Sequence, residues 1–166
     1  MEFDLTRLGE MHPLLAKSTA SEFAHSSAIG LGRHGHKPGV QLSLILKGRS
    51  EPNTLQWVEA PAGATAQLDF HRVTEDTAEA VALAIAHVAN GWVVRRRLQR
   101  GEFADWLLID RRNGLIAMEV SGVDKMDVSG RRMREKLEQA RKCQLPGKKV
   151  ACVVELQPPR SRMRVV

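Results

Sequence analysis

Two short apolar segments, residues 103–110 and 115–121, constrain the fold of this chain most strongly, because each carries one carboxylate where a strand pattern calls for a hydrophobic residue. The dipeptide Asn113-Gly114 lies between them and favours a tight hairpin turn. Side chains alternate between the two faces of a strand. Asp105 in the first segment and Glu119 in the second are therefore predicted to converge on one point of a sheet.

Converging carboxylates on a half-buried surface repel each other and are costly to desolvate, so a compensating cation is expected. Oxygen ligands of this kind suit a hard divalent ion such as Mg²⁺ or Mn²⁺. A structural explanation remains open, in which Asp105 lies at a strand edge in water and Glu119 pairs with Arg95 or Arg97. The carboxylate pair predicts a metal site, with this structural explanation as the alternative.

The sequence pattern between residues 74 and 156 alternates between helix and strand. An apolar stripe predicts a helix from Thr74 to about Ala89, with Thr74 as its N-cap. A second helix is predicted to begin at Asp127 or Ser129 and to end near Lys142. Strands are predicted over residues 92–98, 103–110 and 115–121 between the helices, and over 149–155 as a central apolar strand after them. The predicted order is one helix, three strands, one helix and one strand.

The two ends of the chain give weaker patterns. Residues 1–73 predict a β-rich extension with strands at about 24–32, 39–47 and 54–58, preceded by a short helix or arm. Residues 157–166 read as a basic tail. The predicted fold is one α/β domain with a mixed sheet flanked by helices, in which residues 74–156 form the core.

Length and composition narrow the class of protein. The chain has 166 residues, enough for one sizeable core. No apolar run approaches the roughly 18 residues of a membrane helix, and the N-terminus lacks the features of a signal peptide. Cys143 and Cys152 have no metal-ligand spacing and are predicted to be buried, reduced thiols. These features predict a cytoplasmic protein with no membrane contact.

The charge is distributed unevenly along the chain. Residues 1–90 carry seven Lys and Arg against ten Asp and Glu, whereas residues 91–166 carry eighteen against nine. Basic residues thus concentrate in the half that contains the paired carboxylates. A basic surface around an acidic metal site suits a protein that handles phosphodiesters, so the predicted partner is nucleic acid. A solvated basic surface without a partner is the alternative.

With Asp105 in the second strand and Glu119 in the third, residues 74–156 resemble the PD-(D/E)XK superfamily of restriction-endonuclease-like proteins. The resemblance implies an αβββαβ core in which the aspartate and the glutamate ligate Mg²⁺. It also implies that Glu79, on the first helix, assists as a metal ligand. The stretch from Glu119 to Gly122 is similar to small uncharacterised bacterial proteins as well, which implies no activity.

Ser121 departs from the family pattern, in which a lysine follows two residues after the acid. That lysine is thought to position the attacking water and to neutralise charge in the transition state, whereas a serine hydroxyl supplies no positive charge. Lys125 and Lys136 are the candidates to replace it. Lys136 and Gln139 lie three residues apart on the second predicted helix, and hence on neighbouring faces.

The function that follows is a metal-dependent nuclease-like protein that acts on nucleic acid, with Mg²⁺ or Mn²⁺ as its cofactor. Its catalytic residues are predicted to be Asp105, Glu119, Ser121, Lys125 and Lys136. Its nucleic-acid contacts are predicted to be Arg95, Arg97, Arg131 and Arg132. The alternative is a non-catalytic module on the same fold that binds nucleic acid or a protein partner, a second copy of the chain included.

Overall fold

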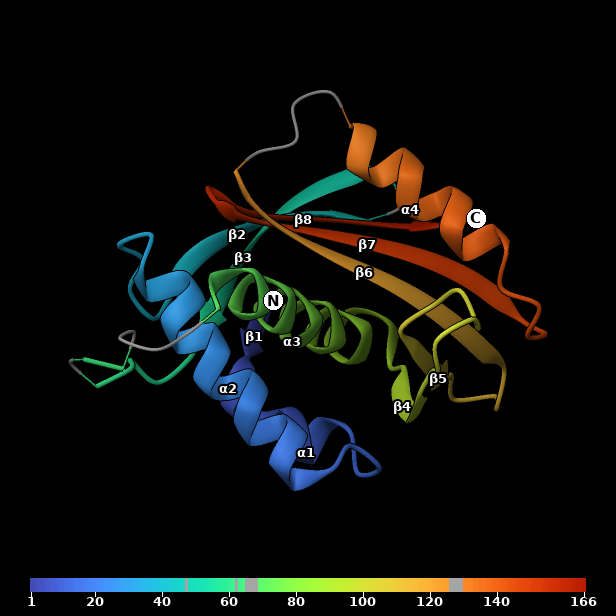
Figure 1. The fold of residues 1–166 in the computed structure, drawn as a ribbon, viewed down its shortest axis with the longest axis horizontal. Helices are drawn as coiled ribbons and strands as arrows, with labels where there is room; N and C mark the ends of the chain where they lie inside the picture. Colours follow the sequence, from blue (N-terminus) through green and yellow to red (C-terminus); the bar gives the residue numbers. More distant parts are fainter. Residues whose placement is uncertain (47, 62, 65–68, 126–129) are drawn as a thin grey trace.

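The two carboxylate-bearing segments pair in the computed structural model (Figure 1), which describes residues 1–46, 48–61, 63–64, 69–125 and 130–166. Strand β5 (Trp106–Ile109) lies antiparallel to β6 (Leu115–Lys125), with Ile109 opposite Leu115. Residues 110–114 connect them, and Asn113 has a positive φ of 60°, which asparagine tolerates. The predicted hairpin is present, with a longer connection than a two-residue turn.

The described residues form a mixed eight-stranded sheet in the order β1-β3-β2-β8-β7-β6-β5-β4. The predicted order of one helix, three strands, one helix and one strand is found along the chain. It consists of α3 (Phe70–Asn90), β4 (Val93–Arg97), β5, β6, α4 (Arg131–Arg141) and β7 (Lys148–Gln157). β7 lies inside the sheet and is parallel to β6, as its apolar sequence predicts. Asp127 and Ser129, the predicted starts of α4, lie outside the described residues.

Helices cover both faces of this sheet (Figure 1). α3 lies on one face together with α2 (Lys17–Gly32), and α4 lies on the other. Residues 80–86 of α3 have no exposed surface, because the helix is packed both by α2 and by the sheet. The N-cap of α3 is Asp69, whose carboxylate accepts a hydrogen bond from the His71 N–H at 2.9 Å. The prediction of Thr74 as the cap is wrong, since the helix begins four residues earlier.

The N-terminal part contains a long helix that the sequence did not predict. Residues 24–32, predicted as a strand, form the second half of α2. The buried residues 26–31 follow one another without a gap, so the segment shows no helical stripe. The strand predicted at 39–47 is present as β2 up to Leu46, and Lys47 lies outside the described residues. The elements of this part are β1 (Glu2–Asp4), a 3₁₀ turn (Leu5–Arg7), α1 (Leu8–Met11), α2, β2 (Val40–Leu46) and β3 (Arg49–Gln56).

The C-terminal segment is an internal strand, which corrects the prediction of a basic tail at residues 157–166. β8 (Pro159–Val165) pairs antiparallel with β7 and parallel with β2. Its arginines alternate with the buried residues Ser161 and Met163, as expected for a strand with one face toward the core. β8 therefore joins the strands of the N-terminal part to the remaining strands in one sheet.

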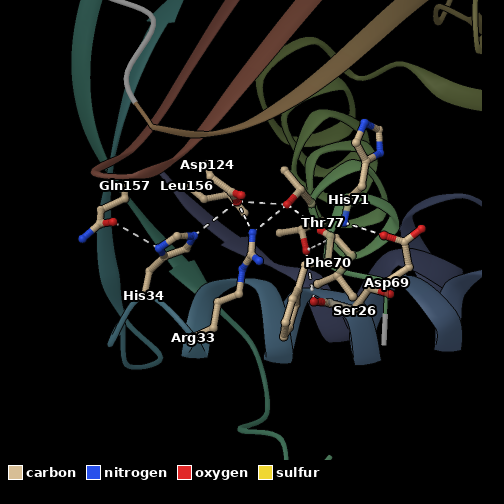
Figure 2. A network of polar contacts seen from close by, with 12 residues as sticks. Ser26, Arg33, His34, Asp69, Phe70, His71, Thr77, Asp124, Leu156 and Gln157 are labelled. Carbon is tan, nitrogen blue, oxygen red and sulfur yellow. Dashed lines mark hydrogen bonds and ion pairs between the residues drawn. The ribbon is translucent and has the colours of Figure 1, made fainter. Parts of the chain in front are cut away.

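A polar network fastens α2 and α3 to the end of β6 (Figure 2). One oxygen of the Asp124 carboxylate accepts hydrogen bonds from the Arg33 guanidinium and from the Thr74 hydroxyl, the latter at 2.9 Å. The same oxygen lies 3.3 Å from the Nε2 atom of His34. Burial acts to raise the pKa of Asp124, but these hydrogen bonds outweigh burial and hold the pKa below its ordinary value. One carboxylate thus links three elements.

Two further predictions concern the membrane and the thiols. Among the described residues, no helix is long and apolar enough to span a membrane. Cys143 and Cys152 are buried and form no disulfide, as predicted. Burial raises the pKa of the Cys152 thiol to about 12, so this cysteine is not a reactive thiolate.

Candidate active site

Asp105 and Glu119 lie on neighbouring segments of the sheet, at the point where β5 begins. The Asp105 N–H donates to the carbonyl of Met118 at 3.0 Å, and the Asp105 carboxylate accepts from the Val120 N–H at 2.7 Å. Asp105 is therefore bound to the backbone on both sides of Glu119. The structure brings together the two carboxylates that strand alternation placed on one face.

The Glu119 carboxylate is almost completely buried, with 1% of the residue exposed. Burial raises its pKa to about 7, the charge of Asp105 adds to this rise, and contact with Lys136 opposes it. Its Oε2 atom is buried, and no hydrogen-bond partner for it is found among the described residues. A buried carboxylate oxygen without a donor is costly, so this atom calls for a proton or a cation.

Lys136 of α4 supplies a positive charge at this position. Its Nζ atom donates to Glu119 Oε1 at 2.5 Å and to Gln139 Oε1 at 3.2 Å. The Lys136 side chain is only 17% exposed, so water screens the ion pair weakly. The i, i+3 spacing of Lys136 and Gln139 on α4 places the glutamine where it holds the ammonium group against Glu119.

The donor atoms at this site suit a hard divalent cation. Two adjacent carboxylates, one with an unused buried oxygen, are the ligand type that Mg²⁺ and Mn²⁺ prefer. Among the residues that the structure describes, no group of three or more His, Cys, Asp or Glu side chains is placed to hold a metal ion. Mg²⁺ is often bound by one or two carboxylates, with water and substrate phosphate as its other ligands. Asp105 and Glu119 fit that pattern.

Ser121 and Lys125 lie on β6, on the same face as Glu119 by strand alternation. Ser121 is buried and lies about 7 Å along the strand from Glu119, a distance set by the rise of about 3.3 Å per residue. Lys125 is exposed at the end of β6, about 20 Å along the strand from Glu119 by the same rise. Of the two candidate lysines, the structure places Lys136 at the carboxylates.

Glu79 lies on the α3 side of the sheet, opposite to the α4 side that Glu119 faces. Its two carboxylate oxygens are 2.8 Å from donors, one on the Trp106 indole and one on the Arg97 guanidinium. Burial raises the pKa of Glu79 to about 7, although Arg97 acts to lower it. Asp105 contributes to the rise through its charge, so the two carboxylates interact electrostatically. As placed here, Glu79 binds the core residue Trp106.

The four predicted nucleic-acid contacts lie at two places. Arg95 and Arg97 are exposed on β4, the edge strand, and Arg97 also lies 5.1 Å above the Trp106 ring. Arg131 and Arg132 lie in the first turn of α4, and each forms an ion pair with Glu135. The structure does not gather these four arginines into one patch with Lys136.

Three partnerships at or near the site were not predicted. The Trp106 indole donates a hydrogen bond to the Glu79 carboxylate. A further buried carboxylate, that of Glu155 in β7, accepts a hydrogen bond at 2.7 Å from Arg162. Arg162 lies in β8, the segment that was predicted to be a basic tail. The contact of Gln139 with Lys136 follows from helical spacing once the helix is placed, and that spacing is the signal that points to it.

The site thus combines two carboxylates able to hold a cation with a buried ammonium group directly beside them. This combination is suited to binding a phosphate and to stabilising negative charge that develops on it. Comparisons of the chain with protein-family models, with curated proteins and with solved structures found no match.

Proposed function

We propose that this protein is a metal-dependent phosphodiesterase that cleaves nucleic acid, with Asp105, Glu119 and Lys136 as its active site. The observation that carries the proposal is the buried contact of Lys136 with Glu119, beside Asp105. These groups correspond to the two acids and the lysine of restriction-endonuclease-like nucleases, with the lysine supplied by α4 instead of position 121. The order α3-β4-β5-β6-α4-β7 supports the same assignment.

Each residue has a distinct role in this proposal. Asp105 and Glu119 hold Mg²⁺, which when bound neutralises phosphate charge and activates a water molecule. Lys136 acts against the effect of burial and lowers the pKa of Glu119, which favours the carboxylate form that binds metal. Its ammonium group also stabilises negative charge on the reacting phosphate, while Gln139 holds it in place.

Nucleic acid is the proposed substrate because of the charge of the half-chain that carries the site. Residues 91–166 hold eighteen Lys and Arg against nine Asp and Glu. Such an excess of positive charge supplies affinity for a phosphate backbone independently of its sequence. Arg95 on the edge strand lies in this half and is exposed to such a substrate.

The decisive experiment measures cleavage of labelled single-stranded and double-stranded DNA and RNA with Mg²⁺, with Mn²⁺ and with chelator. Wild type is expected to cleave one of these substrates with metal only. Asp105→Asn is expected to abolish cleavage, and Lys136→Met to reduce the rate about 10²-fold, which is typical for loss of one charge-stabilising group. Lys142→Met is the matched control, since Lys142 is an exposed residue next to the same helix.

A double variant tests the role of the lysine itself. Ser121→Lys in the Lys136→Met background puts an ammonium group two residues from Glu119 on the same strand face, so it is expected to recover about tenfold of the lost rate. In the wild-type background Ser121→Lys is expected to add little, because Lys136 already serves. If neither wild type nor variants cleave while metal still binds, the nuclease proposal is wrong and the non-catalytic binding module replaces it.

A further inference from the structure

A large pocket of about 1150 Å³ opens where β2 and β8 end and β7 begins. It exceeds the roughly 300–1,000 Å³ of sites for drug-sized ligands, which suits a segment of a polymer better than one small molecule. Among the described residues, one acidic residue, Asp110, lines it. The basic residues that line it are Arg111, Arg112, Arg134, Lys148, Arg162 and Arg164. The lining of the pocket therefore carries a large excess of positive charge.

Three of these cations are not neutralised by the part of the chain that the structure describes. Arg111, Arg112 and Arg164 are exposed and have no ion-pair partner among the described residues. By contrast, Lys148 lies 3.5 Å from Asp110, and Arg162 donates to the buried Glu155. Arg111, Arg112 and Arg164 are thus available to an anionic ligand. Lys148 and Arg162 instead hold neighbouring parts of the pocket lining together.

The remaining lining of the pocket is largely apolar. The apolar residues that line it are Ile45, Leu46, Ala89, Trp92, Met133, Met163 and Val165. A double helix presents phosphates on its outside and hides the faces of its bases. A single strand presents phosphates and base faces together, and bases pack favourably on apolar and aromatic side chains. The combination of unpaired arginines and an apolar wall therefore matches a single strand.

We propose that this pocket binds a segment of single-stranded nucleic acid, with phosphates on Arg111, Arg112 and Arg164 and bases against the apolar wall. The inference rests on the proposed function in taking nucleic acid as the partner. Helix α4 packs on β6 and β7, and it contributes to both places. Arg134 lines the pocket and Lys136 contacts Glu119, so a strand held in the pocket lies close to the helix that carries the proposed catalytic lysine.

Binding without cleavage tests this pocket independently of the catalytic proposal. Binding of labelled 20-nucleotide strands to the Asp105→Asn protein is measured by fluorescence anisotropy, in chelator and at about 50 mM salt. Arg112→Ala with Arg164→Ala is expected to weaken single-strand binding at least tenfold and to lower the log–log salt slope by about 2, roughly one per lost phosphate contact. Lys17→Ala with Lys37→Ala is the matched control, because it removes the same charge outside the pocket. This control is expected to bind within twofold of the parent.

Three comparisons identify the ligand class. An abasic strand of equal length is expected to bind at least tenfold more weakly than the ordinary strand, because it keeps the phosphates and loses the bases. Equal binding of the two, or tighter binding of the duplex, overturns the assignment to a single strand. Competition by polyglutamate as effective as that by unlabelled strand makes the pocket a protein-binding surface instead.

The outcomes for pocket and catalysis are separable. If the pocket variant and its control bind equally, or if no oligonucleotide binds, the pocket proposal is overturned whatever the cleavage assay shows. If binding depends on Arg112 and Arg164 but no metal-dependent cleavage is found, the pocket stands and the nuclease proposal fails. Circular dichroism of the variants checks that their fold is intact.

Discussion

His12 is a fully buried histidine whose two ring nitrogens both have partners. Its Nε2 atom donates to the carbonyl of Leu83 at 3.1 Å, and its Nδ1 atom accepts from the Val94 N–H at 3.2 Å. Only the neutral ring can serve both contacts, because a proton on Nδ1 would face the N–H group. Burial lowers the pKa of His12 to about 4, with a smaller contribution from His87.

The stability of the protein is therefore expected to depend on His12 between pH 7 and pH 5. In the unfolded chain His12 takes up a proton near pH 6.5, whereas in the folded protein it stays neutral down to about pH 4. The unfolded state then binds more protons, so stability falls as the pH falls through this range. The stability advantage of wild type over His12→Asn is expected to shrink by about 2 kcal/mol from pH 7 to pH 5, from 1.36 kcal/mol per pKa unit.

Urea unfolding at both pH values measures this difference. Glu79 and Glu119 have raised pKa values and act in the opposite direction, so the comparison with the variant, and not the wild-type curve alone, isolates His12. His25→Asn replaces an exposed histidine and should show no such change with pH. A stability difference between wild type and His12→Asn that stays constant with pH would show that the buried ring is not the cause.

Strand alternation was sufficient to predict that Asp105 and Glu119 meet, because a strand fixes which side chains share a face. It could not choose between Lys125 and Lys136. That choice depends on how far β6 extends and on how α4 packs over it, and both are set by tertiary contacts. The sequence also could not predict the partner of Glu79. Trp106 directly follows Asp105, so its side chain points to the opposite face of the sheet, where Glu79 lies.

At the scale of elements, α3 and β6 approach each other closely at Gly122. A Cβ atom at this position would lie 2.5 Å from the Thr74 carbonyl oxygen and 3.0 Å from the Ala78 Cβ. Gly122→Ala is therefore expected to destabilise the protein by about 1–3 kcal/mol, the usual cost of overpacking a tight interface. Thermal and urea unfolding measure the loss.

A second glycine provides the control for this substitution. Gly32 is the last residue of α2, and outside its own helix no heavy atom of the described residues lies within 4 Å of an added Cβ. Gly32→Ala is expected to leave stability unchanged or to raise it by up to about 1 kcal/mol, because alanine favours a helix over glycine. Equal effects of the two substitutions would mean that helix propensity, and not the close approach of α3 to β6, determines the result.

Two elements escaped prediction for different physical reasons. In α2 the buried stretch Ser26–Leu31 is continuous and rich in small residues, so the helical period that reveals α3 is absent. In β8 the alternation was present, but arginines at every second position suggested a solvated tail. An internal strand can contain these arginines because they have neighbours such as Glu155, which pairs with Arg162. The two residues are close in the fold but not in the sequence.

At the scale of the whole molecule, β8 makes the sheet continuous. β8 lies between β2, a strand of the N-terminal part, and β7, which leads to the strands that carry the carboxylates. Helix α3 packs against both β1 and β6. We expect the described structure to unfold in one cooperative transition, because neither group of strands keeps its neighbours when the other is lost.

Tryptophan probes on the two sides of β8 test this expectation. Trp57 reports on the end of β3, whereas Trp92 and Trp106 report on β4 and β5. Trp57→Phe, and separately Trp92→Phe with Trp106→Phe, leave fluorescence from one side only. Within each variant, the urea midpoints from fluorescence and from circular dichroism are expected to coincide, and two distinct midpoints would reveal two independently folding parts.

The position of β8 also sets the order of events during synthesis on the ribosome. β2 pairs with β8 through residues such as Ser43 and Arg160, so this edge of β2 stays uncovered until β8 has been made. At about 5–20 residues per second, that delay is on the order of 10 s. Throughout this time the β2–β3 hairpin presents an open edge to other nascent chains. Assembly of the sheet therefore waits for the synthesis of β8, and a slower ribosome or a missing chaperone should reduce the yield of folded protein before it affects the stability of the finished molecule.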